Sequence, residues 1–132
     1  MIEIAKREFP EGNFEVQDAR HLTELDNSWD CVLLMHCLDH LDDYKSAIKE
    51  ATRVSKKYVL IVLWRGFVGQ DHINDRNMYG KNEGEEPWQD TYLHEYSKDD
   101  LENCFKENGL KIEQIAEGET INEQGKYNFL YL

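Results

Sequence analysis

Two continuous apolar runs constrain the fold of this chain more than any other feature. Residues 29–35 (WDCVLLM) and 58–64 (YVLIVLW) have strand length and lack the alternation typical of a strand with one face in solvent. Between them, apolar side chains recur at helical spacing at Tyr44, Ala47, Ile48, Ala51 and Val54. We therefore expect an α/β fold in which the two runs are parallel neighbouring strands joined by a helix.

The residues before the first run predict a helix and a short strand. Apolar residues from Ile2 to Phe9 recur at near-helical spacing, and Pro10 ends the segment. No Ser, Thr, Asp or Asn caps this helix, so we expect that an upstream part is absent. Apolar and polar residues then alternate over 14–18, which predicts a half-buried strand.

The residues after the second run predict a long loop, a helix and two strands. Residues 65–96 are polar and glycine-rich, which is typical either of a substrate-side binding loop or of a disordered insertion. Ser97 predicts a helix start, and Asn108-Gly109 predicts its left-handed end. Residues 110–115 and 127–132 look like strands, and the absence of a helix between them predicts one antiparallel strand near the C-terminus.

Length, net charge and cysteine content limit the kinds of partner and the location that we expect for the chain. With 132 residues it suits one domain, and its net charge of -12 argues against a nucleic-acid partner. No apolar run reaches the ~20 residues that span a bilayer, so we expect no membrane partner and a cytoplasmic location. Three cysteines without a C-x-x-C pair are typical of buried free thiols.

Five segments in this order resemble class I S-adenosylmethionine-dependent methyltransferases of the quinone-biosynthesis and small-molecule type. They are 14–22 with its Asp-Ala pair, 28–32 (SWDCV), 36–41 (HCLDHL), 50–54 (EATRV) and 97–110. The resemblance implies S-adenosylmethionine as cofactor and methyl transfer to a small molecule. The chain departs from the family pattern in two places: it has no G-x-G motif, and Lys56-Lys57 stands where the family usually has Gly-Gly.

The resemblance implies a Rossmann-like methyltransferase sheet that lacks its first two strands. Residues 1–132 would then form a single partial domain, mostly parallel. One edge of strand 29–35 would be open, so we expect that strand 14–18 moves there or that a homodimer or partner chain covers it. Without the glycine turn we expect the chain alone to bind the cofactor weakly, at about millimolar concentration.

The cofactor-binding candidates follow from the resemblance. Asp18 would accept a hydrogen bond from the adenine amino group, and Ala19 would contribute its backbone amide. His36 and His40 would line the methyl-donor pocket. The alternatives are a turn Asp, structural histidines, and a metal site at the i, i+4 histidines, for which a third ligand is not evident.

The acceptor side offers weaker candidates. Trp64, Arg65, Tyr92 and Tyr96 could enclose a substrate, and the aromatic residues could instead anchor the loop. His94 could act as a general base, or be exposed and idle. The predicted function is methyl transfer to an unknown small molecule. The alternative is a catalytically silent remnant or binding module, and a metal-dependent hydrolase comes third.

Overall fold

The structure is a computed structural model that describes residues 2–63, 67, 72–75, 92–115, 118–122 and 125–129. Its regular elements are, in chain order, α1 (Ile2–Glu8), β1 (Trp29–Met35), η1 (Leu38–His40), α2 (Tyr44–Val54), β2 (Ser55–Val62), β3 (His72–Asp75), β4 (Tyr92–Glu95), α3 (Lys98–Glu107), β5 (Gly118–Asn122) and β6 (Gly125–Phe129).

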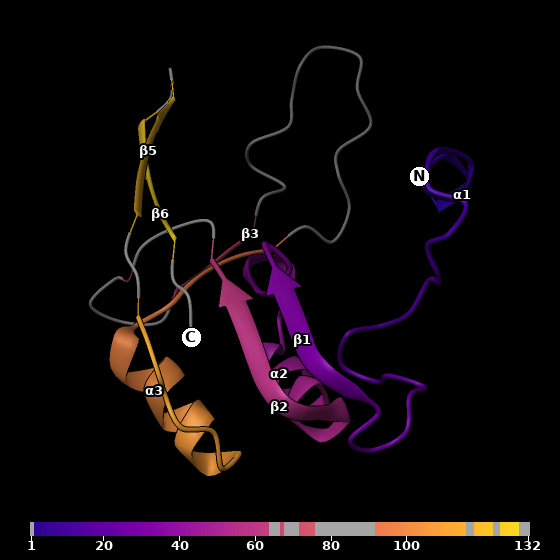
Figure 1. The fold of residues 1–132 in the computed structure, drawn as a ribbon. Helices are drawn as coiled ribbons and strands as arrows, with labels where there is room; N and C mark the ends of the chain where they lie inside the picture. The colour runs from indigo at the N-terminus through magenta and orange to yellow at the C-terminus, as the bar shows by residue number, and fades with distance from the viewer. Residues whose placement is uncertain are drawn as a thin grey trace.

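The centre of the fold is the β1-α2-β2 unit. β1 and β2 pair in parallel, with Cys31 opposite Tyr58 and Met35 opposite Val62, and α2 lies behind the pair (Figure 1). The predicted parallel neighbours and the helix between them are confirmed. β2 begins at Ser55, three residues before the apolar run, because α2 passes directly into it.

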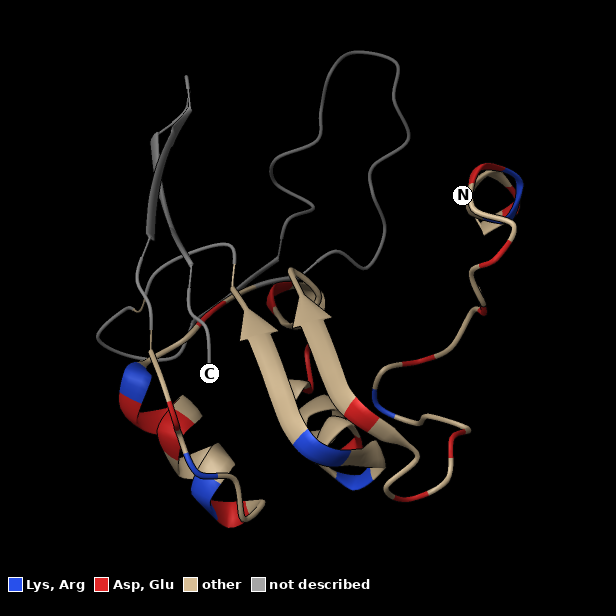
Figure 2. Ribbon diagram, viewed as in Figure 1, with Lys and Arg blue, Asp and Glu red and all other residues tan. Residues whose placement is uncertain are grey.

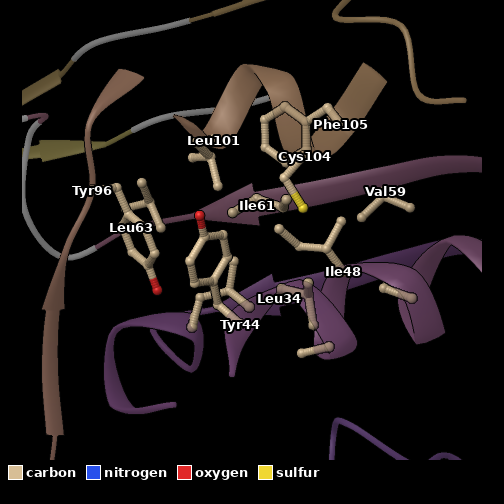
Figure 3. Packing of buried hydrophobic residues seen from close by; sticks show 13 residues of the cluster. Leu34, Tyr44, Ile48, Val59, Ile61, Leu63, Tyr96, Leu101, Cys104 and Phe105 are labelled. Atoms are coloured by element: carbon tan, nitrogen blue, oxygen red, sulfur yellow. The ribbon is translucent and has the colours of Figure 1, made fainter. Parts of the chain in front are cut away.

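Helices α2 and α3 build one core against the sheet. α2 buries Ala47, Ile48 and Ala51, which share one stripe of the helix. α3 adds its own apolar face from Leu101, Cys104 and Phe105. Figure 3 shows side chains from both helices and both strands pointing into this common space. The inner face of the strand pair contributes Leu34 from β1 and Val59 and Ile61 from β2 to this core.

Both predicted ends of α3 are present. The hydroxyl Oγ of Ser97 accepts a hydrogen bond from the backbone N–H of Asp100 at 3.1 Å. The chain leaves the helix through Gly109, whose φ of 74° lies in the left-handed region that glycine adopts at little cost.

Three predicted strands differ in the structure. Residues 14–17 and 110–115 have no strand, because an extended segment needs a hydrogen-bonded neighbour and the described part of the chain offers them none. At the C-terminus, β6 pairs antiparallel with β5 instead of joining β1 and β2. Residues 130–132 lie outside the described residues.

The predicted loop 65–96 is also corrected. β3 and β4 pair antiparallel inside it, with His72 opposite Glu95 and Asp75 opposite Tyr92. The pairing places β4 beside η1, at the end of β1. A segment that looks irregular in sequence thus contributes an ordered strand next to the main sheet.

One face of the central sheet is largely exposed among the residues that the structure describes. Four apolar side chains on it remain more than half exposed, namely Trp29 (52%), Leu33 (52%), Met35 (59%) and Tyr58 (63%). They alternate with the inward residues of the same strands, so α2 covers one face and the other faces outward. The charged residues of β1 and β2 are confined to the strand starts (Figure 2). Within the described sheet β1 has one neighbour, β2, and residues 14–18 do not fill its other edge.

Candidate functional site

The carboxyl end of β1 is where ligand sites open in α/β sheets. After Met35 the chain turns at His36, whose φ of 50° is unusual for a residue with a side chain. The backbone N–H of His36 still donates to the carbonyl of Val62 at 2.9 Å, so the turn begins inside the ladder. η1 then brings His40 around, and Asp43 caps α2 by accepting from the N–H of Ser46 at 3.1 Å.

Asp18 organises a tight turn over 18–21. Its carbonyl accepts from the N–H of His21, and its Oδ1 accepts from the N–H of Arg20, both at 2.9 Å. Side-chain capping of its own turn is the reason aspartate is favoured at such positions. Asp18 therefore has the role in a turn that was expected as the alternative. This role is compatible with the expected contact between the same carboxylate and adenine.

The guanidinium of Arg20 holds the Asp18 carboxylate. Arg20 Nη2 donates to Oδ2 at 2.8 Å, and Nε donates to Oδ1 at 2.9 Å, which is a forked pair. These hydrogen bonds lower the pKa of Asp18 from 3.8 to about 2. The carboxylate is therefore ionised at neutral pH and acts as an acceptor alone.

Arg20 also ties this turn to the start of α2. Its Nη1 donates to Oδ1 of Asp42 at 2.8 Å, across 22 positions of sequence. Ala19, inside the turn, packs against the hydrophobic core. The turn that carries Asp18 and the segment that follows β1 are thereby held together at one end of the sheet.

A second clamp fixes the rest of the connection to β1. Arg53 of α2 donates from Nη1 to Asp26 Oδ1 at 2.7 Å and to the carbonyl of Glu24 at 2.8 Å. Glu50, one turn earlier, accepts from Arg53 Nη2 at 2.8 Å and from the N–H of Leu22 at 2.9 Å. These bonds lower the pKa of Glu50 to about 2, with Arg53 as the main cause.

Sequence reasoning missed this clamp. Residues 50–54 entered the sequence analysis only among the segments that resemble the family, although residues at i and i+3 of a helix can form an ion pair. The spacing of Glu50 and Arg53 does not show that both side chains also bind the loop over 22–26.

A buried aromatic cluster stands beside η1. His94 stacks on Tyr96 with ring centroids 4.4 Å apart and planes 13° apart, and Tyr44 meets His94 edge-on at 4.8 Å. Tyr44 and Tyr96 are themselves 4.9 Å apart at 78°. Such geometries are the favourable ones for aromatic rings. His94 is 4% exposed, so it is not the solvent-exposed histidine of the idle alternative.

The sequence-predicted site residues divide into two groups. Asp18 and Ala19 lie in the 18–21 turn, which is fastened to the segment after His36 and His40. The other group meets in the aromatic cluster, where His94 and Tyr96 touch. Tyr92 contributes its backbone to β4, and its side chain, like all of Trp64 and Arg65, lies outside the described residues.

The described part of the chain has neither a metal-binding group nor a membrane helix. Its His, Cys, Asp and Glu side chains form no set of three or more that could hold a metal ion. No helix among these residues is both long and apolar enough to cross a bilayer.

The Asp18 carboxylate keeps some acceptor capacity beyond its contacts with Arg20. A carboxylate has about four lone-pair positions, and Arg20 approaches them with three donors. Its backbone N–H donates to Oδ1 and Nη2 donates to Oδ2, while Nε is shared between Oδ1 at 2.9 Å and Oδ2 at 3.2 Å. Three donors leave room for a fourth, and Oδ2 can accept it from solvent or a ligand, because the Asp18 side chain is 44% exposed. The sequence holds no G-x-G for the rest of a nucleoside-type ligand.

Comparison with known proteins finds similarity to methyltransferases. Residues 1–63 match the family model described as "Methyltransferase domain". A search of the curated proteins gave no match. Among solved structures, an S-adenosylmethionine-dependent methyltransferase from Methanosarcina mazei is similar, with a TM-score of 0.72 and 17% identity over 98% of this chain and 74% of that chain.

Two further structures show how widely the fold is used. The 1,6-didemethyltoxoflavin-N1-methyltransferase of Burkholderia thailandensis, with 1,6-didemethyltoxoflavin and S-adenosylhomocysteine bound, has a TM-score of 0.65 and 12% identity over 98% of this chain and 52% of that chain. The [4+2]-cyclase SpnF has a TM-score of 0.58 and 20% identity over 88% of this chain and 40% of that chain. The shared fold therefore does not by itself determine the reaction.

Proposed function

We propose that this chain, whose fold is that of S-adenosylmethionine-dependent methyltransferases, takes part in methyl transfer to a small-molecule acceptor with S-adenosylmethionine as cofactor. The observation that carries the proposal is the 18–21 turn, clamped by Arg20 to the segment after β1. It supplies an ionised acceptor for an amino group at the sheet edge where the fold binds its ligands.

In the proposed site each cofactor residue has a separate task. Asp18 accepts from the adenine amino group, and the backbone N–H of Ala19 donates to the ring. His36 and His40 line the methyl-donor side, since they bracket the turn that leaves β1. The cofactor supplies an activated methyl group. The chain has to align the acceptor with that methyl and exclude water.

The acceptor side of the proposed site lies near the aromatic cluster. Tyr92, Tyr96, Trp64 and Arg65 are the proposed substrate-binding residues. His94 is the proposed base for an acceptor that must lose a proton, and its stacking on Tyr96 would hold the imidazole ring in one orientation. An acceptor with a free lone pair needs no such base.

We further propose that residues 1–132 form one partial methyltransferase domain. The absence of a G-x-G and the single neighbour of β1 within the described sheet support this. A second copy or a partner chain would cover the open edge of β1, because an exposed apolar edge pairs readily. The free thiols of Cys31, Cys37 and Cys104 agree with a reducing, cytoplasmic location.

The second candidate function is a catalytically silent binding module, which the missing glycine turn favours. Calorimetric titration of S-adenosylmethionine into the purified chain, with its mass measured by sedimentation, separates the two. An enzyme site predicts weak binding that strengthens when the partner is supplied and that Asp18→Ala diminishes. Glu15→Ala, at a nearby exposed carboxylate outside the Arg20 contacts, is the matched control. Binding that Asp18→Ala leaves unchanged would contradict the proposed contact.

A further inference from the structure

In the function proposed so far Arg20 only fastens the 18–21 turn, yet it makes the densest set of polar contacts around Asp18. Three of its donors reach the Asp18 carboxylate, and a fourth reaches Asp42 at 2.8 Å. The side chain is 34% exposed, so it lies along the surface of the turn. No motif in the sequence singled it out.

The geometry of these contacts restricts the carboxylate. A guanidinium is a planar fork with fixed donor directions, so a bidentate pair sets the plane of the carboxylate as well as its distance. A lysine would supply one mobile point charge and leave the carboxylate free to rotate. With Arg20 in place, Oδ2 can accept a further hydrogen bond from one direction only.

The hydrogen bond from Arg20 to Asp42 also fixes the position of the Asp18 carboxylate relative to α2. Asp42 immediately precedes Asp43, the residue that caps α2, and its Oδ1 also accepts from the N–H of Asp43 at 2.8 Å. Arg20 therefore connects the Asp18 carboxylate to the rigid start of a helix. Without Arg20, two carboxylates would face each other across the same gap, and like charges would push the turn outward.

We propose that Arg20 is a positioning residue for ligand recognition: it aims the free lone pair of Asp18 at an amino group and, through Asp42, fixes where that acceptor stands relative to the end of β1. The inference rests on the proposed cofactor contact of Asp18. Its consequence is selectivity. A fixed carboxylate accepts from an amino group and repels a keto oxygen at the same place, whereas a mobile carboxylate turns away from the keto oxygen and discriminates less.

Three variants separate the parts of this proposal. Arg20→Met removes the fork and the bridge, Arg20→Lys keeps one charge without the fork, and Asp42→Asn weakens the bridge alone. Arg7→Met is the matched control, because Arg7 is an exposed arginine paired with its neighbour Glu8 on α1. Asp18→Asn tests the proposed contact itself.

The first measurement is independent of any ligand. We expect NMR titration of the full chain to give an Asp18 pKa of about 2 in the parent and in Arg7→Met, and a return toward the ordinary 3.8 in Arg20→Met. Asp42→Asn should leave that pKa low and raise amide hydrogen exchange over 19–21 about tenfold, the effect of losing one charge-assisted hydrogen bond. An unchanged Asp18 pKa in Arg20→Met would overturn the proposal.

The second measurement compares two ligands by NMR at millimolar concentration. S-Adenosylhomocysteine carries the amino group, and its inosine counterpart carries a keto oxygen instead. We expect the preference for the amino ligand to fall about tenfold in Arg20→Met, with a smaller fall in Arg20→Lys and Asp42→Asn. Arg7→Met should keep the full preference.

Failure of the inference and failure of the proposed function give different results. If Asp18→Asn abolishes the preference and the Arg20 and Asp42 variants keep it, Asp18 is the contact and Arg20 does not position it. If Asp18→Asn also keeps the preference, the adenine contact itself is wrong, and Arg20 loses its role with it.

Discussion

Neutralising Glu50 tests how the connection between α1 and β1 is held. In Glu50→Gln the side chain keeps its length and loses its charge, so the ion pair with Arg53 and the charged acceptor for the N–H of Leu22 are both weakened. Arg53 retains Asp26 and two backbone carbonyls as partners. The loop should stay in place with less stabilisation.

The magnitude follows from linkage between protonation and folding. The pKa of Glu50 falls from 4.5 to about 2 on folding, and one pKa unit corresponds to about 1.4 kcal/mol, which sets an upper bound of about 3 kcal/mol. The Glu50 side chain is 17% exposed and that of Arg53 is 29% exposed, so solvent reduces this figure to about 1–2 kcal/mol. A lowered folded-state pKa means that the contribution is complete above pH 4.5 and disappears as pH falls toward 2.

Urea unfolding at a series of pH values is the assay. The parent should lose stability between pH 4.5 and 2 more steeply than Glu50→Gln, and the two curves should converge at the acid end. Glu102→Gln is the control, because Glu102 lies on α3 with lysines 4.0 Å away at positions i-4 and i+4. It should cost only ~0.5 kcal/mol. Parallel pH profiles for the parent and Glu50→Gln would refute the assigned role of the clamp.

Four further outcomes are expected. Ile48→Ala should lower the free energy of unfolding by roughly 2–5 kcal/mol, because Ile48 is fully buried between both helices and the sheet, and a loss under 1 kcal/mol in denaturant unfolding would contradict that packing. Ser97→Ala should cost about 1 kcal/mol through loss of the α3 cap, measured in the same way, with Ser28→Ala, at an exposed serine, as the control. In a protein that binds S-adenosylmethionine, His94→Ala should reduce methyl transfer more than cofactor affinity, and an equal loss of both would remove it as the proposed base. Sedimentation should detect a dimer or partner complex, and a stable monomer at all concentrations would argue against a covered β1 edge.

The sequence predicts the β1-α2-β2 unit because its signals are local. Helical spacing from Tyr44 to Val54 and two apolar runs are each complete within a dozen residues, and the parallel pairing of the two strands needs only this unit. The caps at Ser97 and Gly109 are local in the same sense. The strand at 14–18 fails for the opposite reason, since a strand exists only with a neighbour, and alternation says nothing about whether one is present.

The site is less predictable because its key contacts join distant residues. Arg20 meets Asp42 across 22 positions, and Arg53 reaches back 27 to 31 positions to the loop it clamps. An arginine in a polar stretch looks the same whether or not such partners exist. His94 was equally ambiguous, because its burial depends on the pairing of β4 with β3 and on the ring of Tyr44, which is 50 positions away.

The spacing of the β1-β2 register has a consequence for the order in which the chain folds. Each β1 residue pairs with one 26 or 27 positions later, so the central contacts close a short loop at small entropic cost. The unit is complete at Val62, before α3 and the later strands are synthesised. During translation this half of the core can therefore form on emergence from the ribosome, and α3 then adds to an existing surface.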